Sequence, residues 1–246
     1  MANKKKLEVI FSPVLYRHYE NSNAVVVVVD IFRATSAICN AFESGVKKMI
    51  PVPSLDEARE YKKKGYVVAA ERDGIVPDFA DFGNSPFNFT PERVKGKKVA
   101  NSTTNGAKAI QMAGSGKLTL VSSFINISAI VDLLKEKAEN VQILCAGWKG
   151  KFCLEDTLFA GALAKRLIKT GLFESDCDSL AASVDLWGLA ETDPLKYIEK
   201  AMQRQRLKRL GLDDILEYCF TQDSSYSVPF FHEGVLIDYY LQKNNH

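Results

Sequence analysis

Carboxylate side chains follow three of the strands that the sequence predicts. Asp30 comes directly after an almost pure valine run, Glu71 after a later apolar run, and Glu155 and Asp156 shortly after a third. Ligands of parallel α/β sheets bind outside the carboxyl ends of the strands, and carboxylate oxygens are the hard ligands that Mg²⁺ prefers. These four carboxylates are therefore candidate metal ligands, and Asp30, Glu155 and Asp156 are also candidates for catalysis.

Groups suited to binding an anion occur at the same strand ends. The segment Thr103-Thr104-Asn105-Gly106 precedes a predicted helix, so its hydroxyls and backbone N–H groups would face an anion at the positive end of the helix dipole. Arg33 adds a planar guanidinium that can hold two phosphate or sulfonate oxygens. Carboxylates, an arginine and a helix N-terminus at one edge of a sheet indicate a metal-assisted phosphoester site.

Each part of this interpretation has a structural alternative. An aspartate at a strand end, such as Asp30, is about as often only the N-cap of the next helix, and residues 102–105 could equally serve as a cap. Glu155 and Asp156 could instead stabilise the dipole of their own helix. The basic residues between 200 and 209 are typical of a solvated helix face, with a polyanion-binding patch as the weaker reading.

Several well-known catalytic motifs are missing from the sequence. It contains no P-loop, no G-x-G-x-x-G after a strand and no G-x-S-x-G turn. Its three histidines, His18, His232 and His246, all lie away from the candidate strand ends, so a histidine base or nucleophile fits poorly. Acid–base chemistry is therefore expected from Asp, Glu or a metal-bound water.

The elements that would position these groups alternate between strand and helix. Strands are predicted at residues 7–11, 24–29, 49–52, 66–70, 98–101, 118–122 and 141–145, with helices at 36–42, 56–64, 107–112 and 127–137. Later helices are predicted at 154–169, 179–190, 195–210 and 213–219, and the apolar tail 228–240 favours a returning strand. This order predicts an α/β fold, a three-layer α/β/α sandwich with a mostly parallel or mixed sheet and a helical C-terminal part.

Length and composition limit the remaining possibilities. The 246 residues are 46% hydrophobic with no shift in composition, so residues 1–246 are expected to form one compact unit, with two lobes at about 1–150 and 151–246 as the alternative. A net charge of +2 offers no electrostatic reason to bind nucleic acid or a membrane surface. Scattered cysteines, no secretory leader and no long apolar run favour a cytoplasmic protein. The aromatic tail could be core or dimer surface, so a homodimer stays open.

Six motifs then occur in a fixed order between about residues 24 and 161: VVVVVDIFRAT, AERDG, GNSP, STTNGAKA, SSFINISA and CAGWKGKFCLEDTLFAG. As a series they resemble the 2-phosphosulfolactate phosphatase family. The resemblance implies an α/β/α fold particular to that family and a Mg²⁺-dependent phosphatase of the coenzyme M biosynthesis type. It also implies functional roles for Asn84 and Gly147, which residue chemistry alone does not single out.

The residues and the resemblance together lead to one expected function. It is the Mg²⁺-dependent hydrolysis of a small anionic 2-phospho-hydroxy acid, by resemblance (2R)-2-phospho-3-sulfolactate, to 3-sulfolactate and phosphate. The alternatives are a phosphatase for a different small phosphorylated acid, a non-catalytic protein that binds a small anion, and a scaffold whose helical C-terminal third docks a partner.

Roles are expected for three overlapping groups of residues. Catalysis is expected from Asp30, Arg33, Glu155 and Asp156. Metal ligation is expected from Asp30, Glu71, Glu155 and Asp156. Contact with the phosphate or the rest of the substrate is expected from Arg33, Thr35, Ser36, Arg72, Asn84, Thr103, Thr104, Asn105, Gly106 and Gly147. Among these, Arg72 would take the sulfonate or carboxylate of the substrate.

Overall fold

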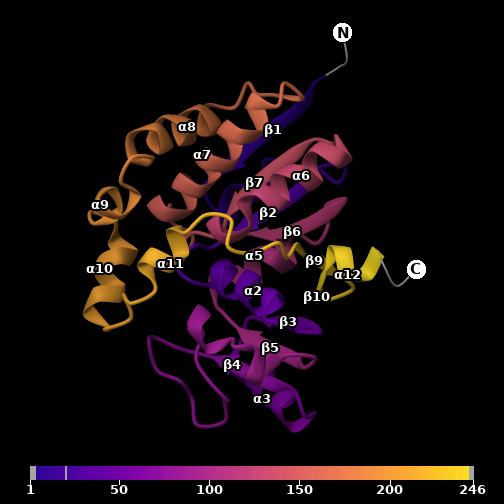
Figure 1. The fold of residues 1–246 in the computed structure, drawn as a ribbon, viewed down its shortest axis with the longest axis vertical. Helices are drawn as coiled ribbons and strands as arrows, with labels where there is room; N and C mark the ends of the chain where they lie inside the picture. Colours follow the sequence, from indigo (N-terminus) through magenta and orange to yellow (C-terminus); the bar gives the residue numbers. More distant parts are fainter. Residues whose placement is uncertain (1–3, 20, 244–246) are drawn as a thin grey trace.

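A mixed sheet of ten strands organises the residues that the computed structural model describes, 4–19 and 21–243 (Figure 1). The strands are β1 (Lys5–Ile10), β2 (Val25–Val29), β3 (Lys48–Val52), β4 (Val67–Ala70), β5 (Lys98–Ser102), β6 (Leu118–Ser122), β7 (Val141–Cys145), β8 (Phe173–Glu174), β9 (Pro229–His232) and β10 (Val235–Asp238). Their order across the sheet is β4-β5-β3-β10-β9-β6-β2-β7-β1-β8. Helices flank this sheet, which confirms the predicted α/β class.

The helices of the described residues include several short ones that the sequence did not predict. They are α1 (Pro13–Tyr16), α2 (Ala34–Glu43), α3 (Leu55–Lys63), α4 (Pro91–Val94), α5 (Asn105–Ala113), α6 (Ile127–Lys137), α7 (Leu154–Lys169), α8 (Asp178–Ala190), α9 (Pro194–Ile198), α10 (Met202–Arg209), α11 (Leu216–Phe220) and α12 (Tyr239–Lys243). No helix in the described part of the chain has both the length and the apolar character needed to cross a bilayer.

Strand β2 shows why the sheet is covered on both faces. Its residues Val25, Val27 and Val29 pack in a cluster with α6 and α7, whereas Val26 and Val28 pack in a second cluster with α2 and α5. Because successive side chains of a strand point to opposite faces, an all-valine strand requires an apolar layer on each side. Helix α8 packs outside α7 along one flank of the molecule (Figure 1).

The C-terminal tail divides the sheet into two parallel blocks. One block is β6-β2-β7-β1-β8 and the other is β4-β5-β3. The tail forms a hairpin of β9 and β10, which pairs antiparallel with β6 on one side and with β3 on the other. The predicted returning strand is therefore a pair of strands, and Phe230 of this hairpin is buried in the chain's own core.

The single helix predicted at 195–210 is wrong, because the structure has two helices, α9 and α10. Ala201 adopts an extended conformation with a ψ of 141° and interrupts the helical path. Side chains stabilise this break, since Arg204 donates to Glu199 over 2.8 Å and to Asp213 over 3.1 Å. The break reorients α10, and Gln203, Arg206 and Leu207 of that helix line the cavity described below. The helix predicted at 213–219 also begins later, at Leu216.

Candidate functional site

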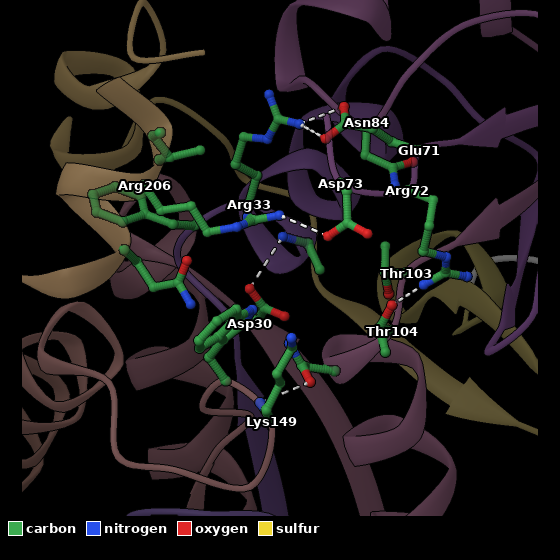
Figure 2. Close-up of a pocket in the computed structure, with 16 residues that line it drawn as sticks. Asp30, Arg33, Glu71, Arg72, Asp73, Asn84, Thr103, Thr104, Lys149 and Arg206 are labelled. Carbon is green, nitrogen blue, oxygen red and sulfur yellow. Dashed lines mark hydrogen bonds and ion pairs between the residues drawn. The ribbon is translucent and has the colours of Figure 1, made fainter. Parts of the chain in front are cut away.

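A cavity of about 260 Å³ lies where the ends of the two parallel blocks meet helix α10 (Figure 2). Asp30 follows β2 and Trp148 follows β7 in the five-stranded block. Glu71 follows β4 and Thr103 follows β5 in the three-stranded block, while Arg206 reaches in from α10. The structure thus brings together the strand ends that the sequence analysis singled out, in a space suited to a small ligand.

Asp30 lies where the N-termini of two helices converge. Its carboxylate accepts a hydrogen bond from the backbone N–H of Ala34 at the start of α2, over 3.4 Å, and from that of Gly106 at the start of α5. A Cβ on Gly106 would lie 2.6 Å from the Cβ of Ala34. Glycine at this position therefore allows α5 to approach Asp30 closely, and the carboxylate is held facing the cavity.

The hydroxyls of Thr35 and Ser36 support the turn that carries Asp30. Thr35 accepts from the backbone N–H of Asp30 and donates to its carbonyl, both over 3.0 Å. Ser36 donates to the carbonyl of Ile31 over 3.0 Å. Both side chains are fully buried, and neither is among the described residues that line the cavity. The structure gives them a positioning role, and their contact with substrate stays a prediction.

Glu155 and Asp156 begin helix α7 and are buried close to Asp30. Asp156 accepts from the backbone N–H of Ile31 and from that of Gly147, each over 2.9 Å, and so ties the turn after β2 to the turn after β7. Oε2 of Glu155 is buried and has no hydrogen-bond partner among the described residues. Asp156 therefore has a clear structural role, whereas Glu155 retains a free oxygen.

Burial makes ionisation of all three carboxylates unfavourable. It raises the pKa of Asp30 to about 6 and that of Glu155 to about 7, and it raises the pKa of Asp156 well above its usual value. The negative charge of Asp30 further raises the pKa of Glu155 and Asp156. A cation among these groups would offset the cost of burying their charge.

We expect the metal-free protein to lose stability as the pH rises from about 4 to about 7. In this range the folded state holds protons on Asp30 and Glu155 that the unfolded chain has already released, so the free energy of unfolding falls as the pH passes their raised pKa values. Each unit of pKa difference corresponds to about 1.4 kcal/mol. Urea unfolding in EDTA measures this slope, and Glu155→Gln should flatten it. A stability that stays constant or rises would contradict the expectation.

Arg33 and Glu71 form a buried ion pair at the cavity wall. The guanidinium contacts both carboxylate oxygens of Glu71, which are therefore engaged (Figure 2). Within the described residues, no group of three or more His, Cys, Asp or Glu side chains is arranged to hold a metal. Mg²⁺, however, commonly takes only one or two carboxylates together with substrate phosphate oxygens and waters. Asp30 and Glu155, whose Oε2 is free, could contribute to such a site, and Glu71 lies at the cavity with its oxygens engaged by Arg33, so its role as a ligand stays a prediction.

The start of α5 and the residues before it line another part of the cavity. Thr103 accepts from the backbone of α5 over 3.0 Å, and Thr104 hydrogen-bonds the guanidinium of Arg72. Asn84 donates to the main chain at the end of β5 over 2.8 Å, and its Oδ1 has no partner among the described residues. Asn105 accepts from the backbone N–H of Lys149 over 3.3 Å. Arg72 is therefore placed beside the start of α5.

Other lining residues were not predicted as site residues: Phe32, Ala34, Asp73, Trp148, Lys149, Gln203, Arg206 and Leu207. The Gly-Trp-Lys-Gly turn after β7 was a visible signal for Trp148 and Lys149, because aromatic and basic residues at a strand end often contact ligands. Nothing in the sequence distinguishes Arg206 from its basic neighbours on α10, which were interpreted as a solvated face.

Comparison with known proteins places the cavity inside a shared region. A family model described as 2-phosphosulpholactate phosphatase matches residues 10–234, which include every residue that lines the cavity. A Thermotoga maritima protein named "Probable 2-phosphosulfolactate phosphatase" is 36% identical over 211 residues, covering 86% of this chain and 90% of the relative. Proteins of the same name from Caldanaerobacter subterraneus and Clostridium novyi are 34% and 31% identical, covering 86% and 92% of this chain and 89% and 97% of the relatives.

Proposed function

Because the chain belongs to the 2-phosphosulfolactate phosphatase family, we propose that it hydrolyses (2R)-2-phospho-3-sulfolactate to 3-sulfolactate and phosphate. The reaction is that of a phosphoric monoester hydrolase: water supplies oxygen to phosphorus, the bond from phosphorus to the ester oxygen breaks, and that oxygen takes up a proton. The observation that carries the proposal is Asp30, a buried carboxylate at two helix N-termini that faces a cavity shared with Arg33. A small, anion-binding, carboxylate-containing cavity is what hydrolysis of a small phosphoester requires.

The phosphoryl group would be held between Arg33 and the start of α5. Glu71 orients the Arg33 guanidinium, which keeps further N–H groups for phosphate oxygens. Thr103 and Thr104 bring hydroxyls to the same place, and the positive end of the α5 dipole favours an anion there. These donors are fixed before the substrate arrives, so they can stabilise charge that builds up in the transition state.

We propose Mg²⁺ as the cofactor, held by Asp30 and Glu155. When bound, Mg²⁺ neutralises charge on phosphate oxygens and makes a bound water more acidic. The buried free oxygen of Glu155 and the unfavourable ionisation of both carboxylates support this assignment. Asp156 would act by holding the turns after β2 and β7 in place, since its oxygens already accept backbone N–H groups.

Phosphate release should therefore stop when divalent cations are removed. We expect no turnover of 2-phosphosulfolactate in EDTA, recovery on adding Mg²⁺, and a roughly 10–100-fold higher Mg²⁺ requirement in Glu155→Gln. The control is Glu174→Gln, which alters an exposed carboxylate of β8. Full activity of the EDTA-treated protein would overturn the metal assignment. The folded protein can also be tested with Mg²⁺ and a panel of small phospho-hydroxy acids. If it releases phosphate from none of them, the phosphatase assignment is overturned and a protein that only binds anions is favoured.

A further inference from the structure

Besides the carboxylates and the helix start that would handle the phosphate, a second group of lining residues carries positive charge. We call it the distal wall, and it consists of Trp148, Lys149 and Arg206. The Nζ of Lys149 lies 4.7 Å from the centre of the Trp148 ring, and the guanidinium carbon of Arg206 lies 5.8 Å from it. The indole thus gathers two positive charges from different elements, the turn after β7 and helix α10.

The Arg206 side chain extends from α10 to the carboxylate of Asp73 (Figure 2). Its Nη2 lies 3.5 Å from Oδ1 of Asp73, in the turn after β4. The Asp73 side chain is 82% exposed, so water screens this pair strongly and it is weak. An arginine that faces a cavity while holding a weakly bound carboxylate is able to exchange that carboxylate for one from a ligand.

The backbone on both sides of this contact is unusual. Asp73 and Lys149 each have a φ of 52°, a left-handed conformation that side-chain-bearing residues rarely adopt. Gly147 is also left-handed, and a Cβ there would lie 2.2 Å from the carbonyl oxygen of Lys151. Strained conformations of this kind persist where the surrounding structure enforces them, and they cluster at ligand-binding sites. The turn after β7 therefore holds Trp148 and Lys149 in place at an energetic cost.

Charge in the cavity indicates what the distal wall would bind. The lining residues with formal charge are Arg33, Arg72, Lys149 and Arg206 on the basic side and Asp30, Glu71 and Asp73 on the acidic side. Arg33 is paired with Glu71, and Arg206 is paired with Asp73. At the distal wall this leaves Lys149 as the cation that has no ion-pair partner among the described residues. A second anionic group on the substrate, separate from its phosphate, would complement this wall.

We propose that the distal wall binds the non-reacting acid group of the substrate, and that Arg206 leaves Asp73 to do so. The inference rests on the proposed function, in which the substrate carries a sulfonate and a carboxylate besides its phosphate. Both are oxyanions that a guanidinium fork can hold through two parallel hydrogen bonds. Asp73 then serves as an internal stand-in for that acid group. Trp148, Lys149 and Arg206 select for phosphoesters that bear a second acid.

Kinetics of Arg206→Gln and Lys149→Gln test this assignment. We expect each substitution to raise KM for 2-phosphosulfolactate about 10- to 100-fold, the scale of one lost charge-assisted hydrogen bond, with a much smaller change in kcat. Inhibition by inorganic phosphate, which has no second acid group, should be unaffected. The matched controls are Arg209→Gln on the same helix and Lys151→Gln in the same turn, both exposed residues outside the cavity lining. Asp73→Asn removes the internal competitor and should lower KM.

Two further arms make each outcome decisive. With 2-phospholactate, which has a carboxylate and no sulfonate, an equal effect of Arg206→Gln assigns the wall to the carboxylate and no effect assigns it to the sulfonate. The proposed role of the distal wall would be overturned if KM were unchanged in both variants, or if phosphate inhibition weakened as much as substrate affinity. Calorimetric binding of 3-sulfolactate requires no turnover. Suppose that the wild type binds 3-sulfolactate, that Arg206→Gln weakens this binding and that no phosphoester is hydrolysed. The proposed role of the distal wall is then supported, and the phosphatase assignment is contradicted.

Discussion

Asp30→Asn is expected to lower the rate of phosphate release at saturating substrate by on the order of 10³-fold, the scale at which loss of one central charged group reduces turnover. The substitution keeps the size of the side chain and an oxygen that can accept from the backbone N–H of Ala34. It removes the negative charge that the proposed cation needs. The measurement is phosphate release from 2-phosphosulfolactate in saturating Mg²⁺.

Stability distinguishes this loss of function from a loss of fold. Burial makes the ionised form of Asp30 unfavourable, so a neutral amide should leave the free energy of unfolding at pH 8 within about 1 kcal/mol of the wild type, or raise it. Asp185→Asn, at an exposed position of α8, is the matched control and should behave as the wild type in both assays. If Asp30→Asn turned over substrate at the wild-type rate, the proposed catalytic role of Asp30 would be wrong.

Gly161→Ala is expected to destabilise the protein by about 3 kcal/mol or more, because it overpacks the contact between α7 and α8. A Cβ at position 161 would lie 2.0 Å from the carbonyl oxygen of Ser183 and 2.9 Å from the Cβ of Trp187. Both neighbours belong to α8, and the nearest is backbone, which cannot rotate away. For a chain of this length the melting temperature should fall by roughly 10 °C.

The same substitution on the facing helix, α8, should change the free energy of unfolding in the opposite direction. Gly188 lies in α8, and a Cβ there would meet no heavy atom within 4 Å. Alanine has the higher helix propensity, so Gly188→Ala should stabilise the protein by up to about 1 kcal/mol. Thermal or urea unfolding of the two variants measures the difference. If both substitutions stabilise, α7 and α8 do not approach as closely as the structure has them.

Local sequence patterns predicted most of the secondary structure and the polar residues at the strand ends. The valine run of β2 and the cap of α3, where Ser54 accepts from the backbone N–H of Glu57 over 3.2 Å, depend on neighbours a few residues away. Such features are readable because hydrophobic period and capping act over one or two turns. The break between α9 and α10 was missed because no proline or glycine marks it; the side-chain contact that spans it joins Arg204 to Glu199.

In the candidate site, too, local patterns were readable from the sequence and long-range contacts were not. The sequence singled out Asp30, Arg33 and Glu155 from their types and their places after strands, and motifs in series indicated the family. It did not reveal that Glu71 would pair with Arg33. Nor did it bring Arg206 into the cavity, because the basic residues of α10 look alike in the sequence.

The sequence by itself therefore determined most of the longer strands and helices, the chemistry available at the strand ends and the family. Tertiary structure alone decided that the C-terminal hairpin separates two parallel blocks, that the cavity forms where their ends meet, and that α10 closes its third side. It also decided which carboxylates are buried, and so the raised pKa values of Asp30 and Glu155. The physical reason is that ion pairing and desolvation depend on distances between residues far apart in the chain, which no local pattern encodes.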